Sequence, residues 1–230
     1  MEAIHAESSG HPTPALAGVP LPLNLPLSLE DQARADLYAL IARLLIAAPD
    51  ASLLACLAAA DPLNSLETAC PLDLAWEKLV LTAGIMDADA IRDEFDALFI
   101  SAGTPQINPY ASLYLAGFLN EKPLAALRAE LAQLGLARIA GVGEMEDHLA
   151  ALCETMRVMI AGEAGAARHS LSRQKQFFEK HIAPWSSRCF DDIRLIDGAN
   201  FYRQLADFSQ EFFSVEAQAF DMEEAGAAGY

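Results

Sequence analysis

The sequence predicts an all-α protein, a single helical domain of about nine or ten helices with a flexible N-terminal tail. Apolar residues recur at helical spacing in one segment after another, and Ser or Asp precedes several of these segments as a candidate N-cap. Strand patterns are nearly absent, because the two short apolar runs RIAGVG and IRLID are too isolated to build a sheet. Short connections between the expected helices are typical of bundles.

Composition limits the class of protein. A chain of 230 residues is long enough for one sizeable core. Although 53% of the residues are hydrophobic, no run of eighteen uncharged apolar residues occurs, so we expect no membrane span. The formal net charge of -17 argues against nucleic acid as a partner, because phosphate binding needs clustered Lys and Arg. A basic partner fits this charge better.

The N-terminal segment and the cysteines of the chain support further predictions. The first thirty residues lack a positively charged region and contain Pro20, Pro22 and Pro26, so we expect no secretory signal and a cytoplasmic protein. The cysteines are widely spaced and form no CxxC pair, which indicates buried free thiols rather than disulfides or a zinc site. They are Cys56, Cys70, Cys153 and Cys189.

The sequence predicts that the chain consists of three regions. We expect residues 1–27 to be a disordered or extended tail, because they are rich in Pro, Gly, Ser and Ala. The helical domain should cover residues 28–222, and residues 223–230 should be a flexible C-terminus. Ser28 is the candidate N-cap of the first helix, which Pro49 ends. The further helices are expected within residues 50–62, 72–84, 87–103, 110–119, 122–136, 144–160, 170–185 and 200–220.

The segment Gly143–Met156, GEMEDHLAALCETM, combines carboxylates with a histidine ahead of a long apolar stripe. On residue types alone, a structural role is favoured, with the acidic residues in the first turn of a helix and His148 as a cap or packing residue. Glu144 and His148 are four residues apart and would share a helix face, a spacing compatible with metal ligands. Because no Glu-x-x-His pair occurs on a helix, we expect no metal and no cofactor.

Enzyme motifs are mostly missing. The chain has no GxxxxGK[ST], no GxSxG and no HExxH. Asp147 and His148 could serve as an acid and a base, but neighbours on a helix point about 100° apart and do not form a dyad. The alternative function is therefore a small all-helical hydrolase acting on a phosphate or nucleotide through Glu144, Asp147 and His148.

Aromatic residues form two further patterns. Tyr110 and Tyr114 are four residues apart and share a helical face with Phe118, as core packing or as the wall of a groove. A second stripe is formed by Phe177, His181 and Trp185 around a break at Pro184. Such a stripe is more often core than a binding site.

Taken in order, five stretches resemble the TorD/DmsD family of redox-enzyme maturation chaperones. The resemblance runs from about residue 33 to residue 213, and the stretches are 34–50, 95–115, 143–156, 177–190 and 200–213. The most specific element is the family's Glu-Pro-x-Asp-His signature, which aligns with residues 144–148 and has Met145 in place of the proline. Two weaker patterns also fit, a Tyr-x-Ser-x-Tyr pattern and a His-x-x-Pro-Trp pattern, at Tyr110, Ser112, Tyr114, His181, Pro184 and Trp185.

The resemblance implies a chaperone rather than an enzyme. Its partner would be the precursor of a DMSO reductase-type molybdoenzyme, and the chaperone would bind the twin-arginine signal peptide and the apo-enzyme, delaying export until the molybdopterin cofactor is inserted. Some family members form domain-swapped dimers, so we expect a monomer or such a dimer. Weak GTP binding is a further property implied by the resemblance.

A twin-arginine peptide joins two guanidinium groups to an apolar segment, so its receptor needs carboxylates beside an apolar groove. We expect Asp147 and Glu144 to face the arginines, and His148 to orient the site. The other residues of the expected client-binding set, several of them lining the groove, are Tyr110, Ser112, Tyr114, His181, Pro184 and Trp185. A third hypothesis is a helical assembly subunit without a peptide site.

Overall fold

The computed structural model describes residues 26–63, 70–100, 104–137, 144–163 and 167–227, with side chains up to Met222. Within these ranges the chain forms ten α-helices, one π-helical turn and no β-strand, which confirms the all-α prediction. The helices are α1 (Leu29–Ile46), α2 (Ala51–Ala58), α3 (Pro71–Ile85), α4 (Ala88–Phe95), α5 (Ala111–Ala116), α6 (Lys122–Gln133), α7 (Leu149–Ala161), α8 (Leu171–His181), α9 (Ala183–Leu195) and α10 (Asn200–Ala227).

Three helices begin where the capping residues predict. The side chain of Ser28 accepts a hydrogen bond from the backbone N–H of Asp31, and Asp50 and Asp87 accept equivalent bonds at the starts of α2 and α4. Each bond satisfies a donor that the helix itself leaves without a partner. Local sequence therefore fixes these boundaries.

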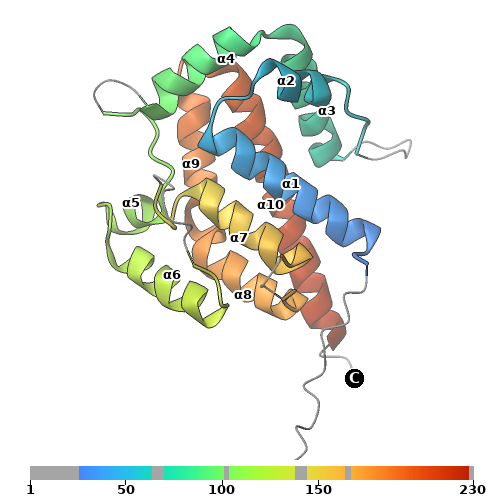
Figure 1. Ribbon diagram of the computed structural model, residues 1–230, viewed down its shortest axis with the longest axis vertical. Helices are drawn as coiled ribbons and strands as arrows, with labels where there is room; N and C mark the ends of the chain where they lie inside the picture. Colours follow the sequence, from blue (N-terminus) through green and yellow to red (C-terminus); the bar gives the residue numbers. More distant parts are fainter. Residues whose placement is uncertain (1–25, 64–69, 101–103, 138–143, 164–166, 228–230) are drawn as a thin grey trace, which may run out of the picture.

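The long helix α10 runs through the molecule, and α3, α8 and α9 pack along it (Figure 1). α1 packs mainly against α7, so these two helices form a pair on the other side of the core. In the view of Figure 1, α2, α3 and α4 lie at the upper end, while α5 and α6 lie on the left, where α5 packs against α6 and α9. The signature segment, residues 144–148, precedes α7 and lies against the start of α5.

Aromatic side chains of α10 join the helices into one core. The ring of Phe212 meets Tyr38 of α1 edge to face at 4.9 Å, and Phe213 meets Phe178 of α8 at 5.6 Å. Burial of such large rings supplies much of the hydrophobic stabilisation of a domain. An ion pair reinforces the contact between α1 and α10, because Arg34 donates to both oxygens of Glu216.

Several expectations are wrong. α9 was not expected as a separate helix; the chain resumes helical structure directly after α8 because Pro184 lies in the first turn, where a missing N–H costs nothing. The expected helix over 87–103 passes into the π-helical turn η1 (Asp96–Ile100). Two cysteines, Cys153 and Cys189, are buried as expected, but Cys56 and Cys70 are exposed because each lies on the outer side of its segment.

Some expectations fall outside the described residues. These are the N-terminal tail apart from residues 26 and 27, the run RIAGVG at 138–143, the loop residues 101–103, residues 228–230, and the side chains of residues 223–227.

Candidate functional site

The signature segment does not begin a helix at its acidic residues. α7 begins at Leu149, and its N-cap is His148, whose Nδ1 accepts a hydrogen bond from the backbone N–H of Ala150 at 3.1 Å. Glu146 and Asp147 form a turn, with the N–H of His148 bound to the carbonyl of Met145 at 3.1 Å, and the extended His148 forms an isolated antiparallel bridge with Tyr110. The expectations that the carboxylates form a first turn, and that Glu144 shares a helix face with His148, are therefore wrong.

Asp147 is fully buried and joins the starts of two helices. Its Oδ2 accepts a hydrogen bond from the backbone N–H of Ser112 at 2.9 Å, and its carbonyl accepts one from the N–H of Ala111 at 3.0 Å. Its Oδ1 and the hydroxyl of Ser112 are buried without a hydrogen-bond partner among the described residues. This geometry favours a positioning role for Asp147 and Ser112, and direct contact of either residue with a client stays a prediction.

Glu144, Tyr110 and His148 lie together next to this junction. The Tyr110 hydroxyl donates to Glu144 Oε2, and the Tyr110 ring meets the His148 ring edge to face at 5.0 Å. Burial lowers the pKa of His148 to about 4, although the carboxylates of Glu144 and Asp147 act in the opposite direction. His148 is therefore neutral near pH 7, and because its Nδ1 is an acceptor, the ring proton is on Nε2.

The remaining predicted residues lie at α8, α9 and the end of α5. Tyr114 stacks on the buried Trp185 at 5.3 Å and donates its hydroxyl to Asp192. His181 is buried beside Glu130, with Nε2 2.9 Å from its Oε2, while Pro184 is exposed. The predicted stripe of Phe177, His181 and Trp185 is core, as expected for its pattern.

The aromatic face expected on one helix over 110–119 does not exist. α5 ends at Gly117, whose φ of +83° is the left-handed conformation that terminates many helices. Phe118 therefore lies beyond the helix and is 70% exposed, while Tyr110 is the N-cap rather than a helical residue.

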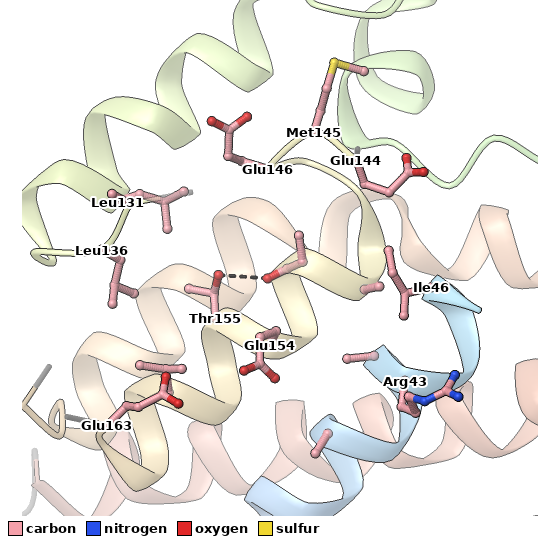
Figure 2. Close-up of a pocket in the computed structure, with 16 residues that line it drawn as sticks. Arg43, Ile46, Leu131, Leu136, Glu144, Met145, Glu146, Glu154, Thr155 and Glu163 are labelled. Carbon is pink, nitrogen blue, oxygen red and sulfur yellow. Dashed lines mark hydrogen bonds between the residues drawn. The ribbon is translucent and has the colours of Figure 1, made fainter. Parts of the chain in front are cut away.

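A groove with a volume of about 480 Å³ lies between α1, α7, the end of α6 and the signature segment (Figure 2). Small and apolar side chains form most of its surface, and four carboxylates stand around them. The residues that line the groove are Ala39, Ala42, Arg43, Ile46, Leu131, Leu136, Ala137, Glu144, Met145, Glu146, Ala150, Ala151, Glu154, Thr155, Val158 and Glu163.

Of the predicted site residues, only Glu144 lines this groove. Tyr114 borders a separate polar pocket with Arg188 and Asp192. The groove residues that sequence reasoning missed are mainly alanines of α1 and α7. Ala39 and Ala42 in one helix and Ala150 and Ala151 in the other could have signalled it, because facing positions without large side chains leave room between packed helices.

Two further findings concern the described part of the chain. Among those residues, no group of three or more His, Cys, Asp or Glu side chains is arranged to hold a metal ion. None of the described helices combines the length and hydrophobicity that are needed to cross a bilayer.

Comparison with known proteins decides the family. A family model described as nitrate reductase delta subunit matches residues 65–191, more than half of the chain. The chain belongs to the nitrate reductase delta subunit family. The match spans the signature segment and the segments of Tyr110 and Trp185, and it confirms the resemblance to redox-enzyme maturation chaperones that the sequence indicated.

Two known proteins are similar to this member of the delta subunit family. A perchlorate reductase assembly chaperone protein of Dechloromonas aromatica (strain RCB) is 29% identical over 131 residues, which cover 52% of this chain and 58% of the relative. The chain thus matches little more than half the length of that relative. A crystal structure of an Archaeoglobus fulgidus protein assigned to redox enzyme maturation has 19% identity and a TM-score of 0.47, covering 77% of this chain and 93% of that one.

Proposed function

We propose that the protein is an assembly chaperone for a molybdenum-cofactor oxidoreductase and is not itself an enzyme. The observation that carries the proposal is the groove between α1 and α7, whose apolar surface is surrounded by carboxylates and includes Glu144 and Met145 of the signature. Support also comes from the family match and from the relative that is described as a perchlorate reductase assembly chaperone.

The ligand of the groove is a segment of the client that carries both basic and apolar residues. Apolar side chains gain free energy when they leave water for a surface such as that of Ile46, Leu131 and Val158. Guanidinium groups make strong hydrogen bonds with carboxylates. A twin-arginine signal peptide has this composition, so the chaperone would cover it in the cytoplasm and delay export until the cofactor is inserted.

The geometry gives less support to a hydrolase that uses Glu144, Asp147 and His148. Oδ2 of Asp147 is bound to the N–H of Ser112, and Nδ1 of His148 is bound to the N–H of Ala150. Both groups serve to hold the backbone, and neither of these two atoms is free to accept a substrate proton. A monomer or domain-swapped dimer and weak GTP binding stay predictions from the resemblance.

The test is retention of a client by variants of the groove. The alanines of α1 and α7 that line the groove, Ala39, Ala42, Ala150 and Ala151, form its floor. Ala151 is partly exposed, so Ala151→Leu should fill part of the groove without entering the core. Ala125→Leu makes the same change on the exposed side of α6 and serves as the control. Each variant would be co-expressed with the tagged precursor of a molybdoenzyme from the same organism, and the chaperone that copurifies would be quantified.

We expect wild type and Ala125→Leu to copurify with the precursor, and Ala151→Leu to copurify about tenfold less, at an unchanged melting temperature. Equal retention by both variants would show that the groove is not the client site. Failure of the wild-type protein to retain any molybdoenzyme precursor of its host would overturn the proposed function.

A further inference from the structure

The four carboxylates of the groove differ in their partners. Glu146 accepts two hydrogen bonds from Arg128, at 3.0 and 2.9 Å. Glu154 accepts from the guanidinium of Arg157 at 2.6 to 2.9 Å, and the same guanidinium lies 3.4 Å from Glu163. Each of these three carboxylates therefore has an ion-pair partner, with Arg157 shared between Glu154 and Glu163.

Glu144 is the exception. Its Oε2 accepts from the hydroxyl of Tyr110, which is neutral, and no described cation forms an ion pair with it. Burial, followed by Glu144 itself, raises the pKa of Tyr110, so the hydroxyl keeps its proton. Arg43, the cation that lines the groove, donates to the carbonyl of Ala47 at the end of α1 instead. Among the described residues, the groove carboxylate without an ion pair thus lies at the signature end.

The apolar surface extends from this end along α7. Ala150 and Ala151 lie in the first turn of the helix, nearest the signature segment, and Val158 lies two turns farther on. Glu163 stands at the opposite end, as Figure 2 shows. The thirteen residues of α7 span about 20 Å, which corresponds to about six residues of an extended peptide.

We propose that the groove has a polarity: it binds a segment with an arginine at Glu144 and with the adjoining apolar residues along the alanine floor toward Val158. The inference rests on the proposed function and adds the direction of the bound segment, with Glu144 rather than the buried Asp147 at its charged end. Oε2 of Glu144 accepts from Tyr110, so Glu144 Oε1 is the acceptor for the guanidinium.

The first test measures affinity. The probe is an acetylated and amidated twelve-residue peptide with two arginines followed by leucines and alanines, titrated by calorimetry. Glu144→Gln removes the charge but leaves an acceptor for Tyr110, while Glu154→Gln removes a carboxylate that is ion-paired with Arg157. We expect affinity to fall about tenfold for Glu144→Gln and less than about twofold for Glu154→Gln.

The second test measures direction. One peptide carries a benzophenone next to the arginines, and another carries it at the apolar end; crosslinked residues are mapped by mass spectrometry. We expect the first label to react at Met145 and the second between Val158 and Glu163. The same peptides with glutamates in place of the arginines should bind at least about tenfold more weakly.

The outcomes separate the two proposals. Crosslinks in the reverse order, or equal losses of affinity in both glutamine variants, would overturn the polarity while client retention by wild type still supported the chaperone. Absence of measurable peptide binding by the wild-type protein would also count against the polarity. Only failure to retain a precursor would remove the proposed function itself.

Discussion

Oδ2 of Asp147 accepts a hydrogen bond from the backbone N–H of Ser112 at 2.9 Å, across a sequence separation of 35 residues. Together with the bond from the N–H of Leu149 to the carbonyl of Pro109, at 2.8 Å, it fixes the segment before α5 against the segment before α7. This junction positions Tyr110 so that its hydroxyl donates a hydrogen bond to Glu144, which lines the groove. A fully buried carboxylate thereby shapes a surface that it does not itself reach.

Asp147→Ala should therefore destabilise the protein by about 2 to 3 kcal/mol, because it leaves the buried N–H of Ser112 without a partner. Denaturant unfolding followed by circular dichroism measures this difference. Ser112→Ala is the matched comparison, since the hydroxyl of Ser112 is buried without a hydrogen bond among the described residues. We expect less than about 1 kcal/mol for that variant, and a similar loss in both would contradict the junction.

The second prediction concerns pH. Burial lowers the pKa of His148 to about 4 in the folded protein, whereas an unfolded chain has its ordinary value of about 6.5. Between these values the unfolded state binds the proton more readily, so the free energy of unfolding falls as pH decreases from 6.5 to 4 and the His148 contribution then levels off. The full loss from this group is about 3 kcal/mol.

His148→Asn isolates the effect, because Asn is also a good N-cap but does not titrate. Stability measured at several pH values should fall less steeply in the variant between pH 6.5 and 4, while stability near pH 7.5 changes by less than about 1 kcal/mol. Parallel curves for wild type and variant would contradict a neutral buried His148.

A third prediction concerns the attachment of α6, which carries Leu131 of the groove. Glu130 accepts from Lys180 at 2.6 Å and lies 2.9 Å from His181 and 3.2 Å from Arg173. Burial raises the pKa of Glu130, but the bonds from Lys180 and His181 outweigh it and lower the pKa on balance. The contribution of this carboxylate is therefore present above its ordinary pKa and lost as pH falls through the lowered value.

Glu130→Ala should cost about 2 to 3 kcal/mol and speed hydrogen exchange in α6, because Lys180, Arg173 and the imidazole of His181 lose their shared partner. Glu179→Ala, which removes an exposed carboxylate paired with Lys175 at 3.6 Å, should change stability by less than about 0.5 kcal/mol. If hydrogen exchange in α6 stayed unchanged in Glu130→Ala, the contacts of Glu130 with Lys180, His181 and Arg173 would not stabilise the packing of this helix.

The last prediction tests the bond between α1 and α10. Arg34→Lys keeps the charge but cannot donate to both oxygens of Glu216, so we expect a loss of about 1 to 2 kcal/mol. Arg92→Lys affects an exposed pair with Asp89 and should be nearly neutral. Thermal unfolding measures the stability of both variants. An equal loss in both would show that the buried two-oxygen contact of Arg34 with Glu216 stabilises the fold no more than an exposed ion pair does.

Patterns within about four residues were sufficient to predict most of the helices. The caps at Ser28, Asp50 and Asp87 and the apolar spacing of α7 depend on hydrogen bonds and side-chain contacts that are local in sequence. The separate helix α9 was missed because Pro184 is compatible both with a break and with a first helical turn, and only packing of Trp185 into the core selects the turn.

The sequence by itself determined the helical class, most helix starts and the family to which the signature points. Tertiary structure alone decided that Asp147 is buried, that His148 is a cap and that Glu144 stands at a groove floored by alanines of α1 and α7. The physical reason is that helical spacing shows which residues share a face, but not which distant backbone meets that face. Pairing with the segment before α5 and packing of α1 on α7 join residues far apart in the chain.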